Sequence, residues 1–96
     1  MPEKLKSMEL TTAQDDKYTS NMKLGENSSS EGQKLEKSAQ EKQKKADTLE
    51  AQGNQDIAIK LNQEAMRDLN LAEQAHLRAA IYHLRNLQLT YEFLNK

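Results

Sequence analysis

Residues 53–96 decide the fold and read GNQDIAIKLNQEAMRDLNLAEQAHLRAAIYHLRNLQLTYEFLNK. The first two, Gly53-Asn54, are suited to a left-handed turn that ends one helix and begins another. Residues 55–96 contain neither glycine nor proline, so nothing in them interrupts a helix. Alanines recur every seven residues on one side of this predicted helix, at Ala58, Ala65, Ala72 and Ala79. Small side chains at this spacing let a second helix approach closely, so the stretch predicts a long helix packed against a neighbour.

The neighbour is predicted in residues 31–52, which are dense in charge and nearly free of large side chains. Apolar residues there follow 4–3–4–3 steps when Lys42 fills the middle position, at Leu35, Ala39, Ala46 and Leu49. A helix with so thin an apolar stripe is marginal alone, so we dock the stripe on the alanine side of the second helix. The expected fold class is all-α: a coiled-coil-like, antiparallel two-helix hairpin with its turn at 53–54 and a long C-terminal helix.

Residues 1–30 are predicted to stay outside this hairpin, which takes up residues 31–96. The segment is polar and ends in the run Gly25-Glu26-Asn27-Ser28-Ser29-Ser30. Such a composition favours a flexible, mostly disordered N-terminal tail. The alternative is a short helix over residues 12–24, with a cap at Thr12 and a stop at Gly25.

The charge balance and the lack of cysteine exclude several classes of function. Among 96 residues, 14 Lys+Arg stand against 15 Asp+Glu, for a net charge of −1. A chain so close to neutral has no electrostatic reason to bind nucleic acid or an anionic membrane surface. Without cysteine, disulfides and cysteine-ligated zinc are excluded, and no apolar run reaches the roughly 18 residues of a membrane span. We therefore expect a cytoplasmic protein with no nucleic-acid, membrane or small-molecule partner.

A second apolar seam runs along the C-terminal part of the long helix. It follows 3–4–3–4–3 steps at Leu77, Ala80, Leu84, Leu87, Tyr91 and Leu94, and it is widened by Ile81, Leu89 and Phe93. At 1.5 Å per residue a helix over residues 55–96 spans about 60 Å, whereas one over residues 31–52 spans about 33 Å. The shorter helix then shields the longer one only as far as about residue 77. The most apolar third lacks a partner in its own chain, so we expect it to be buried against another surface.

This uncovered third predicts a non-enzymatic protein–protein interaction module. We expect a small chaperone or assembly adaptor that binds a helical partner through residues 77–94. The predicted partner-binding residues are Leu77, Ala80, Ile81, Leu84, Leu87, Tyr91, Phe93 and Leu94. The alternative is a structural subunit that uses the same seam to self-associate into a helical bundle or filament.

The motif Glu73-x-x-His76 has the spacing that carboxylate-bridged di-iron bundles use, and His83 lies two turns further along roughly the same side. It allows a lesser alternative, a metal-binding helical oligomer that uses Glu73, His76 and His83. The plainer interpretation is a set of surface or interfacial histidines, so we expect no metal and no cofactor. Neither a Gly-rich phosphate loop nor a serine–histidine set points to an enzyme, so we expect no catalytic residues.

Overall fold

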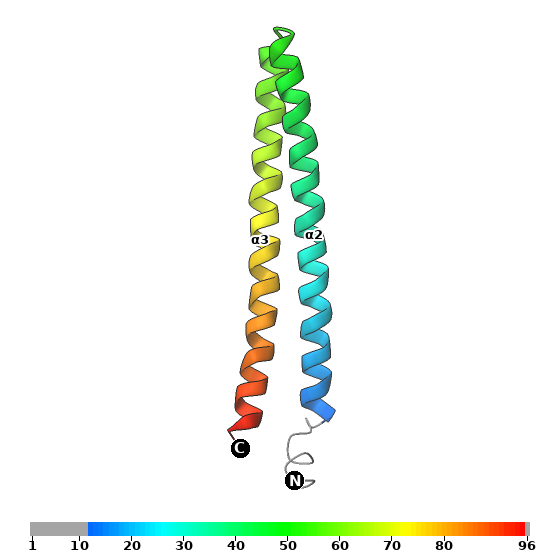
Figure 1. The fold of residues 1–96 in the computed structure, drawn as a ribbon, viewed down its shortest axis with the longest axis vertical. Coiled ribbons are helices and arrows are strands. Elements are labelled where there is room, and N and C mark those ends of the chain that lie inside the picture. Colours follow the sequence, from blue (N-terminus) through cyan, green and yellow to red (C-terminus); the bar gives the residue numbers. More distant parts are fainter. Residues whose placement is uncertain (1–11, 96) are drawn as a thin grey trace.

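The computed structural model describes residues 12–95, which form two antiparallel α-helices. Helix α2 covers Thr12–Ala51 and helix α3 covers Gln55–Leu94, each 40 residues long. Figure 1 shows the two helices side by side along their length, with the turn at one end and the start of α2 beside the end of α3 at the other. The hairpin measures 72 × 18 × 16 Å along its principal axes. The predicted all-α antiparallel hairpin is confirmed.

The turn between the helices has the hydrogen bonds of a Schellman motif. The amide of Asn54 donates to the Leu49 carbonyl at 2.8 Å, and the amide of Gly53 donates to the Glu50 carbonyl at 3.0 Å. Gly53 has a φ of 86°, a left-handed conformation that favours glycine because a side chain would clash there. The turn predicted at 53–54 is confirmed, although the Asn54 side chain forms no capping hydrogen bond.

The helices meet along a surface, here called the inner face, whose residues recur in alternating steps of three and four. On α3 the inner face consists of Ala58, Leu61, Ala65, Asp68, Ala72, Ala75, Ala79, Tyr82, Asn86, Leu89 and Phe93. On α2 it consists of Gln14, Tyr18, Asn21, Gly25, Ser28, Gly32, Leu35, Ala39, Lys42, Ala46 and Leu49. All of these residues are buried or half-buried. Alternating steps of three and four keep one side of a helix turned toward its partner, which is the coiled-coil pattern.

Helix α2 begins at Thr12, so the prediction of a disordered tail was wrong for residues 12–30. The inner face continues through this segment, but there it is built from tyrosine, glycine and polar side chains. The residues of the inner face recur here at helical spacing, but their hydrophobicity is low. The prediction of a disordered tail relied on hydrophobicity and therefore missed the helix. The short helix considered over residues 12–24 is part of α2, which continues through Gly25. The rest of the predicted tail, residues 1–11, lies outside the described residues.

The extension of α2 overturns the argument from helix length. Because both helices have 40 residues, α2 lies along α3 as far as the C-terminal end of α3 (Figure 1). The prediction that residues 77–94 lack a partner in their own chain was therefore wrong. Helix α2 covers the side that carries Ala79, Tyr82 and Asn86 and leaves the opposite side of this segment exposed.

The core of the hairpin is made of small side chains. Within residues 12–95 no large side chain is fully buried, and the buried apolar residues are Ala39, Ala46, Ala58, Ala65, Ala72 and Ala75. At Gly32 the His76 ring of α3 fills the space where a side chain would stand, because a β-carbon added there would come within 2.8 Å of the ring. Close backbones gain dispersion contacts, but alanines remove little apolar area from water. The hairpin therefore leaves most of the large apolar side chains of α3 outside its core.

Candidate protein-interaction face

A second surface of α3, here called the outer seam, consists of Leu77, Ala80, Leu84, Leu87, Tyr91 and Leu94. Leu77, Leu84 and Tyr91 each follow an inner-face residue by two positions, which is about 200° around a helix. The outer seam therefore lies on the side of α3 that faces away from α2. Ile81 adjoins it one residue after Ala80.

The outer seam is open to solvent along its whole length. The exposed fraction is 59% for Leu77, 56% for Leu84 and 70% for Tyr91. Leu87 and Leu94 are also more than half exposed, and Ala80 and Ile81 are exposed as well. Single exposed apolar residues are common on proteins, but a contiguous row of this kind is typical of an interaction site.

Phe93 differs from the other residues predicted to bind a partner. It is half-buried and continues the inner face together with Tyr82 and Leu89. The Arg85 guanidinium lies 5.4 Å from the centre of the Tyr82 ring, within the range of a cation–π interaction. The aromatic residues of α3 are thus divided: Tyr82 and Phe93 belong to the hairpin, and Tyr91 belongs to the outer seam.

Polar and charged residues mark where the outer seam begins. Continued toward the turn in the same steps of three and four, the row passes through Glu73, Asn70 and Gln63, all exposed. The same row holds two exposed apolar residues, Met66 and Ile59. The continuous apolar row starts only at Leu77.

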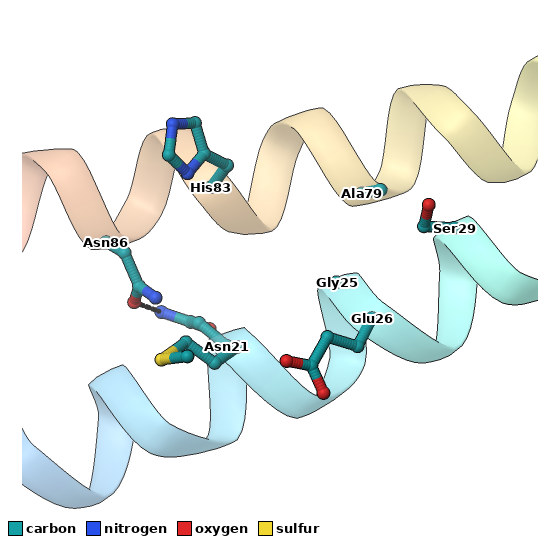
Figure 2. A pocket seen from close by; sticks show the side chains of 8 residues that line it. Asn21, Gly25, Glu26, Ser29, Ala79, His83 and Asn86 are labelled. Atoms are coloured by element: carbon teal, nitrogen blue, oxygen red, sulfur yellow. Dashed lines mark hydrogen bonds between the residues drawn. The ribbon is translucent and has the colours of Figure 1, made fainter.

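Two asparagines join the helices behind the outer seam. Asn21 Nδ2 donates to Asn86 Oδ1 at 3.0 Å, and Asn86 Nδ2 donates to the Tyr18 carbonyl at 3.2 Å. Figure 2 shows Asn86 reaching from α3 toward Asn21 of α2. Asn86 is only 6% exposed, and a buried asparagine in a coiled-coil seam specifies the register of its helices. Sequence reasoning missed this pair because the first helix was predicted to begin after Asn21.

A groove of about 250 Å³ lies next to this asparagine pair. It is lined by Asn21, Met22, Gly25, Glu26, Ser29, Ala79, His83 and Asn86. Figure 2 shows Gly25 and Ala79 on facing stretches of the two helices. Neither Gly25 nor Ala79 carries a large side chain that could fill the groove.

A second polar cluster lies nearer the turn. Lys42 Nζ and Ser38 Oγ each donate to Asp68 Oδ2 at 2.8 Å, and Lys42 Nζ also lies 3.9 Å from Glu64 Oε2. The hydrogen bond from Lys42 and then that from Ser38 hold the pKa of Asp68 below its ordinary value, against an opposing effect of desolvation. Lys42 occupies the middle position of the predicted apolar stripe, and its pairing with Asp68 explains how a cation fits on the inner face.

The structure does not bring the predicted metal ligands together. His76 Nε2 lies 2.5 Å from Glu36 Oε1 of α2, while Glu73 and His83 are exposed. Within residues 12–95 no group of three or more histidine or carboxylate side chains is arranged to hold a metal ion. The partner of His76 is therefore a carboxylate across the hairpin, which sequence spacing within one helix does not reveal.

Comparison with models of protein families, with curated proteins and with solved structures found no match for this chain. Neither of the two described helices has an apolar stretch of the length needed to cross a membrane. What the structure does show is an extended helical hairpin with many exposed apolar side chains on α3.

Proposed function

We propose that this chain is a non-enzymatic protein–protein interaction module that binds a helical partner through the outer seam of α3. The observation that supports the proposal is the exposure of the seam's large side chains, each more than half open to water: Leu77, Leu84, Leu87, Tyr91 and Leu94. Removing apolar surface from water is favourable by about 25 cal/mol per Å². A complex in which a partner covers the row gains this free energy, whereas the hairpin alone leaves the row in water.

The spacing of the outer seam selects a helix as the partner. Steps of three and four residues place the side chains in one row, and such a row fits between the side chains of another helix as knobs into holes. An extended strand has a two-residue repeat and does not match this row. The partner surface is therefore an apolar helical face.

In this role the hairpin acts as a small chaperone or assembly adaptor. Residues 77–94 are already helical in the hairpin, where α2 packs against their inner-face side chains. A preformed face loses less conformational entropy on binding than a segment that must first fold. The client's apolar helix is masked from water while it is bound, which prevents it from associating elsewhere.

The test is capture of partner proteins from an extract of the source cells by the purified chain. Leu84→Asp places a carboxylate in the middle of the seam, and Met66→Asp is the matched control, an exposed apolar residue of α3 outside the seam. We expect Leu84→Asp to weaken capture at least about tenfold, because a desolvated carboxylate costs more than about 1.4 kcal/mol. Met66→Asp should retain capture, and both variants should keep the helical circular dichroism of the wild type. Equal capture by Leu84→Asp and the wild type contradicts the proposal.

A further inference from the structure

We infer that the outer seam is occupied, in the absence of another partner, by a second copy of this chain docked antiparallel, α3 against α3. The inference rests on the proposed function, because it uses the same seam and names the seam's first partner. It is supported by the order of side chains along the seam, by the absence of charge beside it and by the polarity of α2.

The seam matches itself when the second copy runs in the opposite direction. A two-fold axis between Leu84 and Leu87 sets Leu84 at the level of Leu87 of the second copy. The same axis sets Leu77 at the level of Leu94 of the second copy. The 3–4–3–4–3 steps read the same from either end, which an antiparallel pair of helices requires.

The remaining layer favours the antiparallel arrangement over the parallel one. The two-fold axis sets Ala80, the smallest residue of the seam, at the level of Tyr91 of the second copy, the largest. In a parallel pair Tyr91 would meet Tyr91, and Ala80 would meet Ala80. One layer would then be overfilled and another would hold a void, both of which close packing disfavours.

No permanent charge lies along either long side of the seam. His83 and Thr90 lie along one side of it, and Ile81 and Gln88 lie along the other. A charged border would need an opposite charge at the position that faces it in the second copy, or it would be desolvated without a partner. The outer seam avoids this penalty.

The two arginines of this segment are engaged within the hairpin. Arg78 Nη2 donates to Glu31 Oε2 of α2 at 3.0 Å, and Arg85 lies over the Tyr82 ring. Arg78 is thereby held toward α2, and Arg85 is held on the inner-face residue Tyr82. Neither guanidinium group therefore lies on the seam that is offered to a second copy.

Helix α2 has no comparable surface. Its side facing away from α3 carries Asp16, Lys23, Lys37, Lys44 and Asp47, all exposed. Docking through α3 gives the order α2–α3–α3–α2, in which this polar side stays in water. The apolar seam is covered without burying a lysine or a carboxylate.

Sedimentation equilibrium of the full chain tests whether the second copy binds. We expect the wild type to sediment at twice the chain mass of 11.0 kDa, Leu84→Asp at the mass of one chain, and Met66→Asp at the mass of the dimer. Leu87→Asp serves as a second seam variant, and circular dichroism verifies that each variant is helical. A wild type that stays at the single-chain mass, or a dimer that survives in both seam variants, overturns the inference.

Disulfide trapping tests the direction of the second copy. The chain has no cysteine, so Leu77→Cys and Leu94→Cys each introduce the sole thiol. These two positions are about 26 Å apart on one helix, while a disulfide needs α-carbons within about 7 Å. When the two variants are mixed and oxidised, the antiparallel dimer gives the mixed disulfide. Formation of Leu77→Cys and Leu94→Cys homodisulfides alone overturns the antiparallel arrangement.

These experiments separate failure of the inference from failure of the proposed function. A monomeric wild type whose capture of other proteins is lost in Leu84→Asp overturns the inference and leaves the proposed function standing. A dimer that Leu84→Asp dissociates, with capture of other proteins unchanged, overturns the proposed function and supports self-association as the purpose of the seam.

Discussion

Gly25 and Gly32 lie on the same inner face of α2 but leave different amounts of space for a side chain. A β-carbon at Gly25 would lie 3.6 Å from the Tyr82 β-carbon, an ordinary contact, whereas one at Gly32 would lie 2.8 Å from the His76 ring. Glycine inside a helix is about 0.8–1 kcal/mol less favourable than alanine. The two positions therefore separate helix propensity from the cost of moving His76.

We expect Gly25→Ala to raise the free energy of unfolding by about 1 kcal/mol. Gly32→Ala should gain less, because the imidazole must move and give up its contact with Glu36. In a His76→Ala background the obstacle is absent, and Gly32→Ala should stabilise the hairpin as much as Gly25→Ala does. Urea unfolding of the four variants measures these differences. If Gly25→Ala and Gly32→Ala raise the free energy of unfolding equally in the native background, the β-carbon added at Gly32 does not clash with the His76 ring.

Asp68 is expected to make stability depend on acidity. Its folded-state pKa lies below the ordinary 3.8 because Lys42 and then Ser38 donate hydrogen bonds to the carboxylate. As the pH falls, the unfolded chain takes up this proton first, so stability rises with pH across the interval between the two pKa values. The contribution of Asp68 is complete above the unfolded pKa and is lost as the pH falls through the folded one.

Urea unfolding at several acidic pH values tests this contribution. We expect the difference in stability between the wild type and Asp68→Asn to shrink as the pH falls below 3.8, the ordinary pKa of the carboxyl. Lys42→Met removes the largest cause of the lowered pKa, so its stability should change less steeply with pH than that of the wild type. A wild-type curve parallel to that of Asp68→Asn would show that the carboxylate gains nothing from its neighbours.

At the scale of the helices, polar residues on the inner face determine how α2 and α3 are aligned. The Asn21–Asn86 pair joins the open end of the hairpin, and the Lys42–Asp68 pair joins the half nearer the turn. Alanines alone allow a slip of the register, because one alanine layer resembles the next. Buried polar pairs prevent it, since a slip would leave their groups without partners.

We expect the double variant Asn21→Leu with Asn86→Leu to be more stable than the wild type but less specific for a single alignment of the two helices. Two leucines bury more apolar area than the asparagine pair, by about 1–2 kcal/mol in total. They also remove the hydrogen bonds that select one alignment, so species larger than the wild type should form. Thermal melting measures the gain, and sedimentation detects the added species. A double variant that is less stable than the wild type would show that the pair stabilises the fold as well as aligning it.

The sequence predicts α3 well and α2 only in part, for a physical reason. Helix α3 lacks glycine and proline and repeats alanine every seven residues, so periodicity and hydrophobicity agree. In residues 12–30 the inner face carries Tyr18, Asn21, Gly25 and Ser28, so that only the spacing indicates a helix. These residues stay helical because α3 lies beside them, a tertiary effect that local composition does not contain.

The candidate site follows the same division. The outer seam was predicted because its 3–4 steps are apolar at every position. Phe93 is predicted to widen this seam, but the structure places it half-buried on the inner face, seven residues after Asn86. An asparagine gives no hydrophobic signal, so the phase of the inner face near the C-terminus becomes clear only when α2 is in place.

At the scale of the whole molecule, the hairpin buries its small side chains and exposes its large ones. The core within residues 12–95 is made of alanines, while five large residues of the outer seam are each more than half exposed. Small cores give small net stabilities, because conformational entropy opposes folding at every residue. Burying the outer seam against a partner therefore adds stability to a hairpin whose own packing supplies little. Association and folding should then be linked.

This linkage predicts a melting temperature that depends on protein concentration. If the folded chain is a dimer, each tenfold dilution lowers its apparent stability by up to about 1.4 kcal/mol, and 1 kcal/mol shifts the melting temperature of a domain this size by about 4–8 °C. Leu84→Asp should melt at one temperature over the whole range, since it has no dimer to lose, and the wild type should approach that temperature as it is diluted. Circular dichroism melts of both chains over several tenfold dilutions make the measurement. A wild-type melting temperature that does not change with concentration would mean that the hairpin is stable without a partner on its outer seam, and the exposed leucines would then contribute nothing to folding.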